Sequence, residues 1–164
     1  MNSIQIDFSV ALSPGETYQT FVEDFNDWWP AEYTWSQDQL KTIYIVGEVG
    51  GLCTEIGPHG FRCDWGRVTE LEMDHKLVFK WQIGPRREPI PDPEKASDIK
   101  VIFQDQGGST MIRFEHYNFE KHGEGADEYR QMMSSEYGWA YILDRYQKHC
   151  KHKKLLSVSD ISRR

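Results

Sequence analysis

The residues best suited to chemistry in this 164-residue chain are Glu115-His116-Tyr117, near the end of a predicted strand. Successive side chains of a strand point to opposite faces, so His116 shares a face with Ile112 and Phe114. These apolar neighbours indicate that His116 points into the core or into a cavity. A neutral imidazole there could hydrogen-bond a ligand or act as a base near neutral pH. A histidine with a purely structural hydrogen bond is the alternative.

Aromatic side chains are the second group with binding potential, because they make up 13% of the chain and include six Trp. Several lie on elements expected to face one common space, and aromatic walls suit a flat or apolar ligand. The predicted ligand-cavity residues are Trp65, Trp81, Phe103, Phe114, His116, Tyr137 and Trp139. Trp28 and Trp29 are adjacent, so they must point differently, and they are predicted to lie at the entrance. An aromatic-rich core without a pocket is the other interpretation.

No metal-ligand or nucleophile pattern accompanies these residues. The six His lack metal-ligand spacing, and the nearest pair, His149 and His152, is interpreted as chance. The chain has no Gly-x-Ser-x-Gly, phosphate loop, dinucleotide fingerprint or Cys/His nucleophile pattern. We therefore name no catalytic residue, no metal and no cofactor, and we lean away from an enzyme.

The elements that must position these residues follow from hydrophobic periodicity and turn residues. Alternation from Ile4 to Val10 predicts a first strand, and Ser13-Pro14-Gly15-Glu16 predicts a capped helix start. A second short helical turn ends at Trp28-Trp29-Pro30. Further strands are predicted at about 40–47, 50–56, 61–72, 76–83, 98–105 and 109–118. One long helix with an apolar face is predicted from about Asp127 to His149 or Lys151.

This order predicts an α+β domain in which a curved antiparallel sheet wraps around the long C-terminal helix, with two short helices after the first strand. A helix cannot lie flush on a strongly curved sheet, so the leftover space is the predicted cavity. Residues 1–152 are expected to form this single domain, and residues 153–164 a flexible tail. The Pro- and charge-rich segment 84–97 is either a solvated connector or a lid over the cavity mouth.

Charge and cysteine content exclude several classes of function. The net charge of −7 argues against nucleic-acid binding, and no apolar run approaches the roughly 18 residues of a membrane span. Residues 145–164 hold seven Lys/Arg and one acidic residue. This basic end either complements the helix dipole or, as the minority interpretation, meets a partner. Three Cys and no recognisable signal peptide predict a cytoplasmic protein.

The element order and several local motifs resemble the START-like, or SRPBCC, superfamily with its helix-grip fold. The motifs are Val49-Gly50-Gly51, Gly66-Arg67-Val68, Lys76-Leu77-Val78-Phe79-Lys80-Trp81, Gly107-Gly108-Ser109-Thr110, Phe114-Glu115-His116 and Gly138-Trp139-Ala140-Tyr141-Ile142-Leu143. Within the superfamily the chain looks most like proteins related to the C-terminal domain of the activator of the ninety-kilodalton heat-shock protein ATPase. The resemblance covers roughly residues 3–150 and implies a fold more than a function.

Three functions of different classes follow. The favoured one is binding of a small apolar or aromatic molecule in the cavity between sheet and helix. The resemblance implies a second, a regulator that binds a chaperone. The third is a cyclase- or hydrolase-type enzyme in which His116 acts with Tyr or Glu partners. The sequence leaves monomer and homodimer open.

Overall fold

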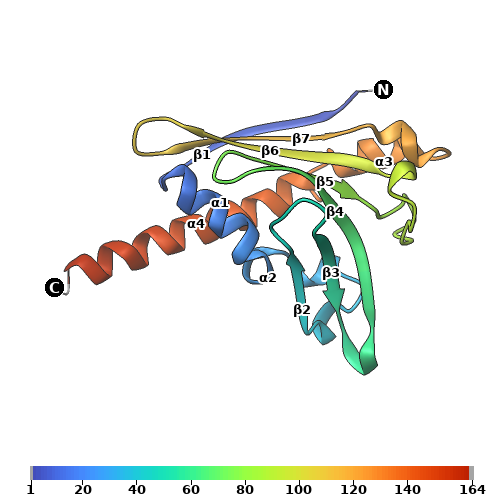
Figure 1. Cartoon of the computed structure of the whole chain (residues 1–164), viewed down its shortest axis with the longest axis horizontal. Coiled ribbons are helices and arrows are strands. Elements are labelled where there is room, and N and C mark those ends of the chain that lie inside the picture. Colours follow the sequence, from blue (N-terminus) through green and yellow to red (C-terminus); the bar gives the residue numbers. More distant parts are fainter. Residues whose placement is uncertain (1, 163–164) are drawn as a thin grey trace.

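The computed structural model describes residues 2–162, with side chains for residues 2–157, and shows an antiparallel sheet bent around a long helix (Figure 1). The strands are β1 (Ile4–Val10), β2 (Thr42–Ile45), β3 (Leu52–Ile56), β4 (Arg62–Glu72), β5 (Lys76–Trp81), β6 (Ser97–Asp105) and β7 (Thr110–Tyr117). Their spatial order is β1-β7-β6-β5-β4-β3-β2. Consecutive strands from β2 to β7 therefore pair with each other, and β1 closes the far edge beside β7.

Four α-helices accompany this sheet in the described residues, namely α1 (Pro14–Glu23), α2 (Phe25–Trp28), α3 (Ala126–Met133) and α4 (Trp139–Ser162). The start of α1 is the predicted capping box, because the Ser13 side chain accepts from the Glu16 N–H and the Glu16 carboxylate accepts from the Ser13 N–H. Short 3-10 helices lie at Ala31–Tyr33, Gln37–Gln39, Pro58–Gly60, Pro93–Lys95 and Phe119–His122. None of the helices within residues 2–162 has the length and apolar character of a membrane span.

The bend of the sheet lies along β4, which is shared by both halves. Its first part, Arg62–Arg67, pairs with β3, and its second part pairs with β5. A register shift interrupts each pairing, and such bulges bend and twist a strand. Gly66 sits between them, where an added Cβ would lie 2.5 Å from the carbonyl oxygen of Lys80. Figure 1 shows β2, β3 and β4 turning away from the upper layer formed by β1, β7 and β6.

The hydrophobic core fills the concave side of this sheet. Trp139, Leu143, Tyr146 and Cys150 from α4 are all buried there. The Tyr146 hydroxyl donates to the carbonyl of Thr17 over 2.7 Å, which joins α4 to α1. The predicted curved antiparallel sheet wrapped around a C-terminal helix, with two short helices after the first strand, is confirmed.

The helical region after β7 differs from the single helix that was predicted. It is divided into α3 and α4 by a turn at residues 134–138. Gly138 permits this turn, because an added Cβ would overlap the carbonyl of Met133. In addition, α4 continues to Ser162 instead of ending near Lys151, so residues 153–162 are helical. The flexibility expected of residues 153–164 stays a prediction, and residues 163–164 lie outside the described part.

Candidate functional site

A cavity of about 310 Å³ lies where the bent half of the sheet meets α3 and the α3–α4 turn. Four of the six tryptophans line it. The lining residues are Trp29, Tyr33, Thr34, Trp35, Gln37, Ile43, Glu55, Trp65, Trp81, Ile83, Arg87, Tyr129, Met132, Met133, Tyr137, Gly138 and Ile142. The cavity is therefore mainly aromatic and apolar, with few polar groups.

The floor of the cavity is built from indole rings in contact. The rings of Trp29 and Trp65 are nearly parallel, with 19° between their planes and 6.0 Å between their centroids. Trp81 meets Trp65 edge-on at 5.8 Å, and Phe25 stacks behind Trp65. The indole N–H of Trp65 is buried and has no hydrogen-bond partner among the described residues. The floor is therefore a packed aromatic surface, which suits a flat or apolar molecule.

Tyr129 of α3 holds one wall in place. Its hydroxyl accepts from the Trp81 indole N–H over 2.6 Å and donates to the Ile83 carbonyl over 2.8 Å. Burial raises the pKa of Tyr129, so this hydroxyl stays protonated at neutral pH. The hydroxyl therefore fixes the Trp81 ring against α3.

Glu55 of β3 is a functional candidate that the sequence reasoning missed. Its side chain is only 1% exposed, and it lines the cavity. One carboxylate oxygen accepts from the Trp35 N–H at 3.2 Å, and the other accepts from the N–H and hydroxyl of Ser36 at 2.8 and 2.7 Å. These bonds tie the irregular segment 34–37 to the sheet. Strand alternation places Glu55 on the same face as the buried Cys53, and that signal could have identified it.

Two segments with unusual backbone form the mouth of the cavity. Gln37 has φ +50° and Arg87 has φ +63°, a left-handed conformation that is uncommon for such residues and tends to occur at functional sites. The Arg87 N–H donates to the Gly84 carbonyl at 2.9 Å. The Trp35 indole N–H donates to the Arg87 carbonyl at 2.8 Å. Trp35 thus connects the 34–37 segment with the start of the 84–97 segment.

Four of the aromatic residues predicted for the site are found at this cavity. Trp65 and Trp81 form the floor, and Tyr137 lies on the rim, where its side chain is 72% exposed. Trp29, predicted at the entrance, is part of the wall. Its neighbour Trp28 is buried and donates its indole N–H to the Phe21 carbonyl, so Trp28 belongs to the core and not to the mouth.

The remaining predicted residues, Phe103, Phe114, His116 and Trp139, do not line the cavity. They are fully or almost fully buried on the concave face, where the start of α4 fills the space above the sheet. The Trp139 ring packs on Phe114 with 4.5 Å between centroids, and Phe103 packs against Tyr18 of α1. Helix packing therefore occupies the space that the sequence reasoning assigned to a ligand at these positions.

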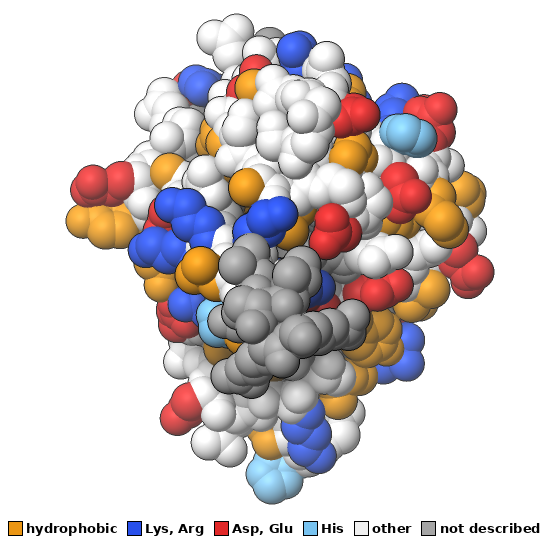
Figure 2. All heavy atoms as spheres, turned by 90° about the vertical axis from the view of Figure 1, so that its left-hand side faces the viewer, with side chains coloured by type: hydrophobic (Ala, Val, Ile, Leu, Met, Phe, Trp, Pro, Cys, Tyr) orange, Lys and Arg blue, Asp and Glu red, His pale blue; other side chains and the backbone are white. Residues whose placement is uncertain are grey.

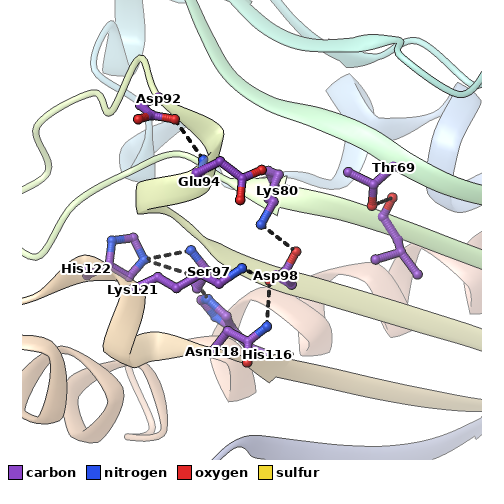
Figure 3. A network of polar contacts seen from close by, with 11 residues as sticks. Thr69, Lys80, Asp92, Glu94, Ser97, Asp98, His116, Asn118, Lys121 and His122 are labelled. Carbon is purple, nitrogen blue, oxygen red and sulfur yellow. Dashed lines mark hydrogen bonds and ion pairs between the residues drawn. The ribbon is translucent and has the colours of Figure 1, made fainter.

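His116 belongs to a buried chain of hydrogen bonds (Figure 3). The Trp139 indole N–H donates to His116 Nδ1 at 2.9 Å. Ser97 Oγ lies 2.7 Å from His116 Nε2 and 2.7 Å from His122 Nε2. Burial, and then the charge of His122, hold the pKa of His116 well below its usual range. Both ring nitrogens of His116 form hydrogen bonds within the protein, as in the structural alternative given in the sequence analysis.

The outer face of the sheet carries a second polar cluster, also drawn in Figure 3. Lys80 and Asp98 form an ion pair at 3.0 Å whose side chains are only 8% and 10% exposed. The Asn118 side chain donates to Asp98 at 2.9 Å. Lys100 of β6 and Glu115 of β7 form a cross-strand ion pair at 3.3 Å.

The basic end of α4 meets an acidic residue of the short helices. Figure 2 looks onto this end of the molecule, where basic and acidic side chains are interspersed. Asp24 accepts from Lys153 at 2.8 Å and lies 3.1 Å from His149. Asp24, Asp27 and His149 are close enough together for a metal ion, but the Lys153 ammonium already occupies the carboxylate. The cluster is a salt bridge, and we assign no metal to it.

Comparison with known proteins agrees with this architecture. Residues 11–151 match the family described as activator of Hsp90 ATPase homolog 1-like protein. The chain belongs to this family. The predicted resemblance is therefore confirmed, although no protein of curated function matches the chain.

Several solved structures share the fold of this activator-homologue family member. The anthrahydroquino-gamma-pyrone synthase Txn09, complexed with a molecule denoted SUM, is 26% identical, with a TM-score of 0.64 over 90% of this chain and 96% of its own. The self-sacrificing resistance protein CalC from Micromonospora echinospora is 21% identical, with a TM-score of 0.64 over 92% and 95%. The Aha1 dimer from Colwellia psychrerythraea is 18% identical, with a TM-score of 0.58 over 90% and 94%.

Proposed function

We propose that this protein binds a small, flat aromatic or apolar molecule in the cavity between the bent sheet and the α3–α4 turn. The observation that carries the proposal is the cavity itself, which has about 310 Å³ of space and four tryptophans in its lining. That volume lies at the lower end of small-molecule sites, which are typically about 300–1,000 Å³. Stacking on parallel indole rings adds to the gain from apolar burial.

The solved relative with the highest identity quoted above supports a role in small-molecule chemistry. Txn09 is named as a synthase of a polycyclic aromatic compound and was solved in a complex. We propose binding and not synthesis for this chain, because the two buried cavity side chains that could transfer a proton, Glu55 and Tyr129, are already hydrogen-bonded within the protein. Glu55 is hydrogen-bonded to Trp35 and Ser36, and the Tyr129 hydroxyl to Trp81 and Ile83.

An enzyme that uses His116 is not supported by this geometry, since His116 is fully buried and lies outside the cavity lining. A chaperone-linked role has family membership behind it and remains the second candidate. A pull-down and an ATPase assay with the cognate chaperone test it, and absence of both binding and stimulation would reject it.

The first experiment on the binding proposal is a comparison of native and denaturing mass spectra of freshly purified protein. A mass excess present only in the native spectrum would identify a captured ligand and its class. A titration with the neutral fluorescent probe N-phenyl-1-naphthylamine then tests the site, and we expect one probe per chain with quenching of tryptophan emission.

Two matched variants locate the bound probe. Met132→Trp adds bulk at the cavity mouth, whereas Met73→Trp adds the same bulk to an exposed turn that does not line the cavity. We expect Met132→Trp to weaken probe binding and Met73→Trp to leave it unchanged. Equal affinities for both variants and the wild type would show that the probe does not use this cavity.

A further inference from the structure

We infer that the ligand of this cavity carries an acidic group that pairs with Arg87 at the mouth. The inference rests on the proposed function and adds to it the chemical class of the ligand, namely an aromatic or apolar body with one anionic end.

The cavity lining contains two charged residues, Glu55 and Arg87. Glu55 is buried, and its carboxylate already receives three hydrogen bonds from Trp35 and Ser36. Arg87 is exposed at the mouth, so its guanidinium is the charge that a ligand entering the cavity would meet first.

Arg87 has no acidic partner within the part of the chain that the structure describes. None of the ion pairs found there includes it. The adjacent Glu88 is not available, because its carboxylate accepts from the Arg86 N–H at 2.8 Å and folds over Gly84. Glu88 and Arg86 line a separate surface groove, and neither of them lines the cavity.

The backbone holds Arg87 at the mouth through two hydrogen bonds and a left-handed conformation. Its N–H binds Gly84, its carbonyl binds the Trp35 indole, and its φ of +63° is one that arginine rarely adopts. Tyr33 and Tyr137 line the same cavity as Arg87 and form its aromatic rim. The backbone of Arg87 is therefore held at the mouth, which places its positive side chain beside the aromatic walls.

A guanidinium in this setting favours an anionic oxygen group. Its planar donors match carboxylate or sulfonate oxygens in pairs, and an apolar surrounding strengthens such charge-assisted bonds. The rest of the cavity lining is mainly aromatic and apolar, so the ligand should place its apolar part inside and its acidic group at Arg87. A cationic ligand would be oriented in the opposite sense and would be opposed by Arg87.

The test compares two fluorescent probes that share one aromatic skeleton. 1-Anilinonaphthalene-8-sulfonate carries a sulfonate, and N-phenyl-1-naphthylamine is the same ring system without it. We expect wild-type protein to bind the sulfonate about tenfold more tightly, since a hydrogen bond to a charged group contributes a difference of that order. Arg87→Gln should remove this preference, Arg87→Lys should retain part of it, and Arg86→Gln should leave it unchanged.

The two proposals fail in different ways in this experiment. If both probes bind once per chain, are weakened by Met132→Trp, and show equal affinity in the wild type and in Arg87→Gln, the acidic-group inference is overturned while the binding proposal stands. If neither probe shows binding that Met132→Trp weakens, the proposed function fails, and the inference fails with it. Loss of preference in Arg86→Gln as well as in Arg87→Gln would indicate general surface charge and would also overturn the inference.

Discussion

The indole N–H of Trp139 donates to His116 Nδ1 over 2.9 Å, and this contact fixes where the protons lie in the chain behind it. An indole nitrogen can only donate, so a neutral His116 carries its proton on Nε2. His116 Nε2 then donates to Ser97 Oγ, and the Ser97 hydroxyl donates to His122 Nε2. The order makes His116 a structural histidine rather than a free base.

This arrangement predicts a loss of stability in mild acid. Burial lowers the pKa of both His116 and His122. Below about pH 6.5 the unfolded chain takes up protons that the folded chain does not, so the free energy of unfolding falls by up to about 1.4 kcal/mol per pH unit for the fully buried His116 and by less for the partly buried His122. Urea unfolding at about pH 7.5 and about pH 5.5 measures the effect.

A pair of variants tests whether these histidines cause the loss of stability in mild acid. His116→Gln should show a smaller loss between the two pH values than the wild type, because the fully buried one of the two imidazoles with a lowered pKa is absent. His59→Asn, at an exposed turn with φ +56°, should show the wild-type loss. A pH dependence that is unchanged in His116→Gln would contradict the explanation.

Removal of the Glu55 carboxylate should loosen the attachment of segment 34–37 to the sheet. Glu55→Ala leaves the N–H groups of Trp35 and Ser36 without acceptors, at a cost of about 1–3 kcal/mol in unfolding free energy and with weaker probe binding. Glu55→Gln keeps an acceptor oxygen and should lose less. Glu70→Ala, which removes a 59%-exposed carboxylate paired with Lys76, is the control and should cost less than about 1 kcal/mol. Equal costs for Glu55→Ala and Glu70→Ala would refute the anchoring role.

Breaking the buried ion pair of Lys80 and Asp98 should destabilise the protein far more than breaking a partly exposed ion pair on the same sheet. Lys80→Met leaves Asp98 buried with Asn118 and the more distant Lys121 as partners, and we expect a loss of about 3 kcal/mol in denaturant unfolding. Lys100→Met breaks a pair that is partly exposed and should cost less than about 1 kcal/mol. Similar losses for the two variants would show that burial does not distinguish the pairs.

The three free cysteines should differ in reactivity toward a thiol reagent. Cys53 and Cys150 are buried, whereas Cys63 is partly exposed. Burial raises the pKa of Cys63 to about 11, so its reaction should be slow near neutral pH and faster as the pH rises. We expect one labelled thiol in folded protein, three after unfolding, and none in folded Cys63→Ser. Rapid labelling of two thiols in the folded state would contradict the burial pattern.

The fold could be predicted because its signals are local and repeated. Alternating side chains mark each strand, and Gly- and Pro-containing turns separate the hairpins. The break between α3 and α4 was missed because Ser134-Ser135-Glu136-Tyr137 does not interrupt the apolar spacing strongly. The helical end of α4 was missed because Leu155 and Leu156 are exposed, so packing gives no reason for a helix there and local propensity decides.

The site was predicted only in part. Strand alternation shows on which face of the sheet a side chain lies, but it does not show which part of the concave face stays empty. Trp65 and Trp81 lie at the bend of the sheet, where the helix cannot follow, and they line the cavity. Phe103 and Phe114 lie on straighter strands that α1 and Trp139 cover. Arg87 could not be assigned because its role depends on a turn conformation in a segment without periodicity.

Trp35 joins the two sides of the cavity mouth by one hydrogen bond, from its indole N–H to the Arg87 carbonyl. A contact of this kind contributes about 1 kcal/mol and breaks readily in water, and loop motions occur in nanoseconds to microseconds. The two segments that form the mouth are therefore only weakly joined. Bound ligands should exchange quickly with solution. Their residence time should depend on how well they fit the indole rings of the cavity floor, and not on how fast the mouth opens.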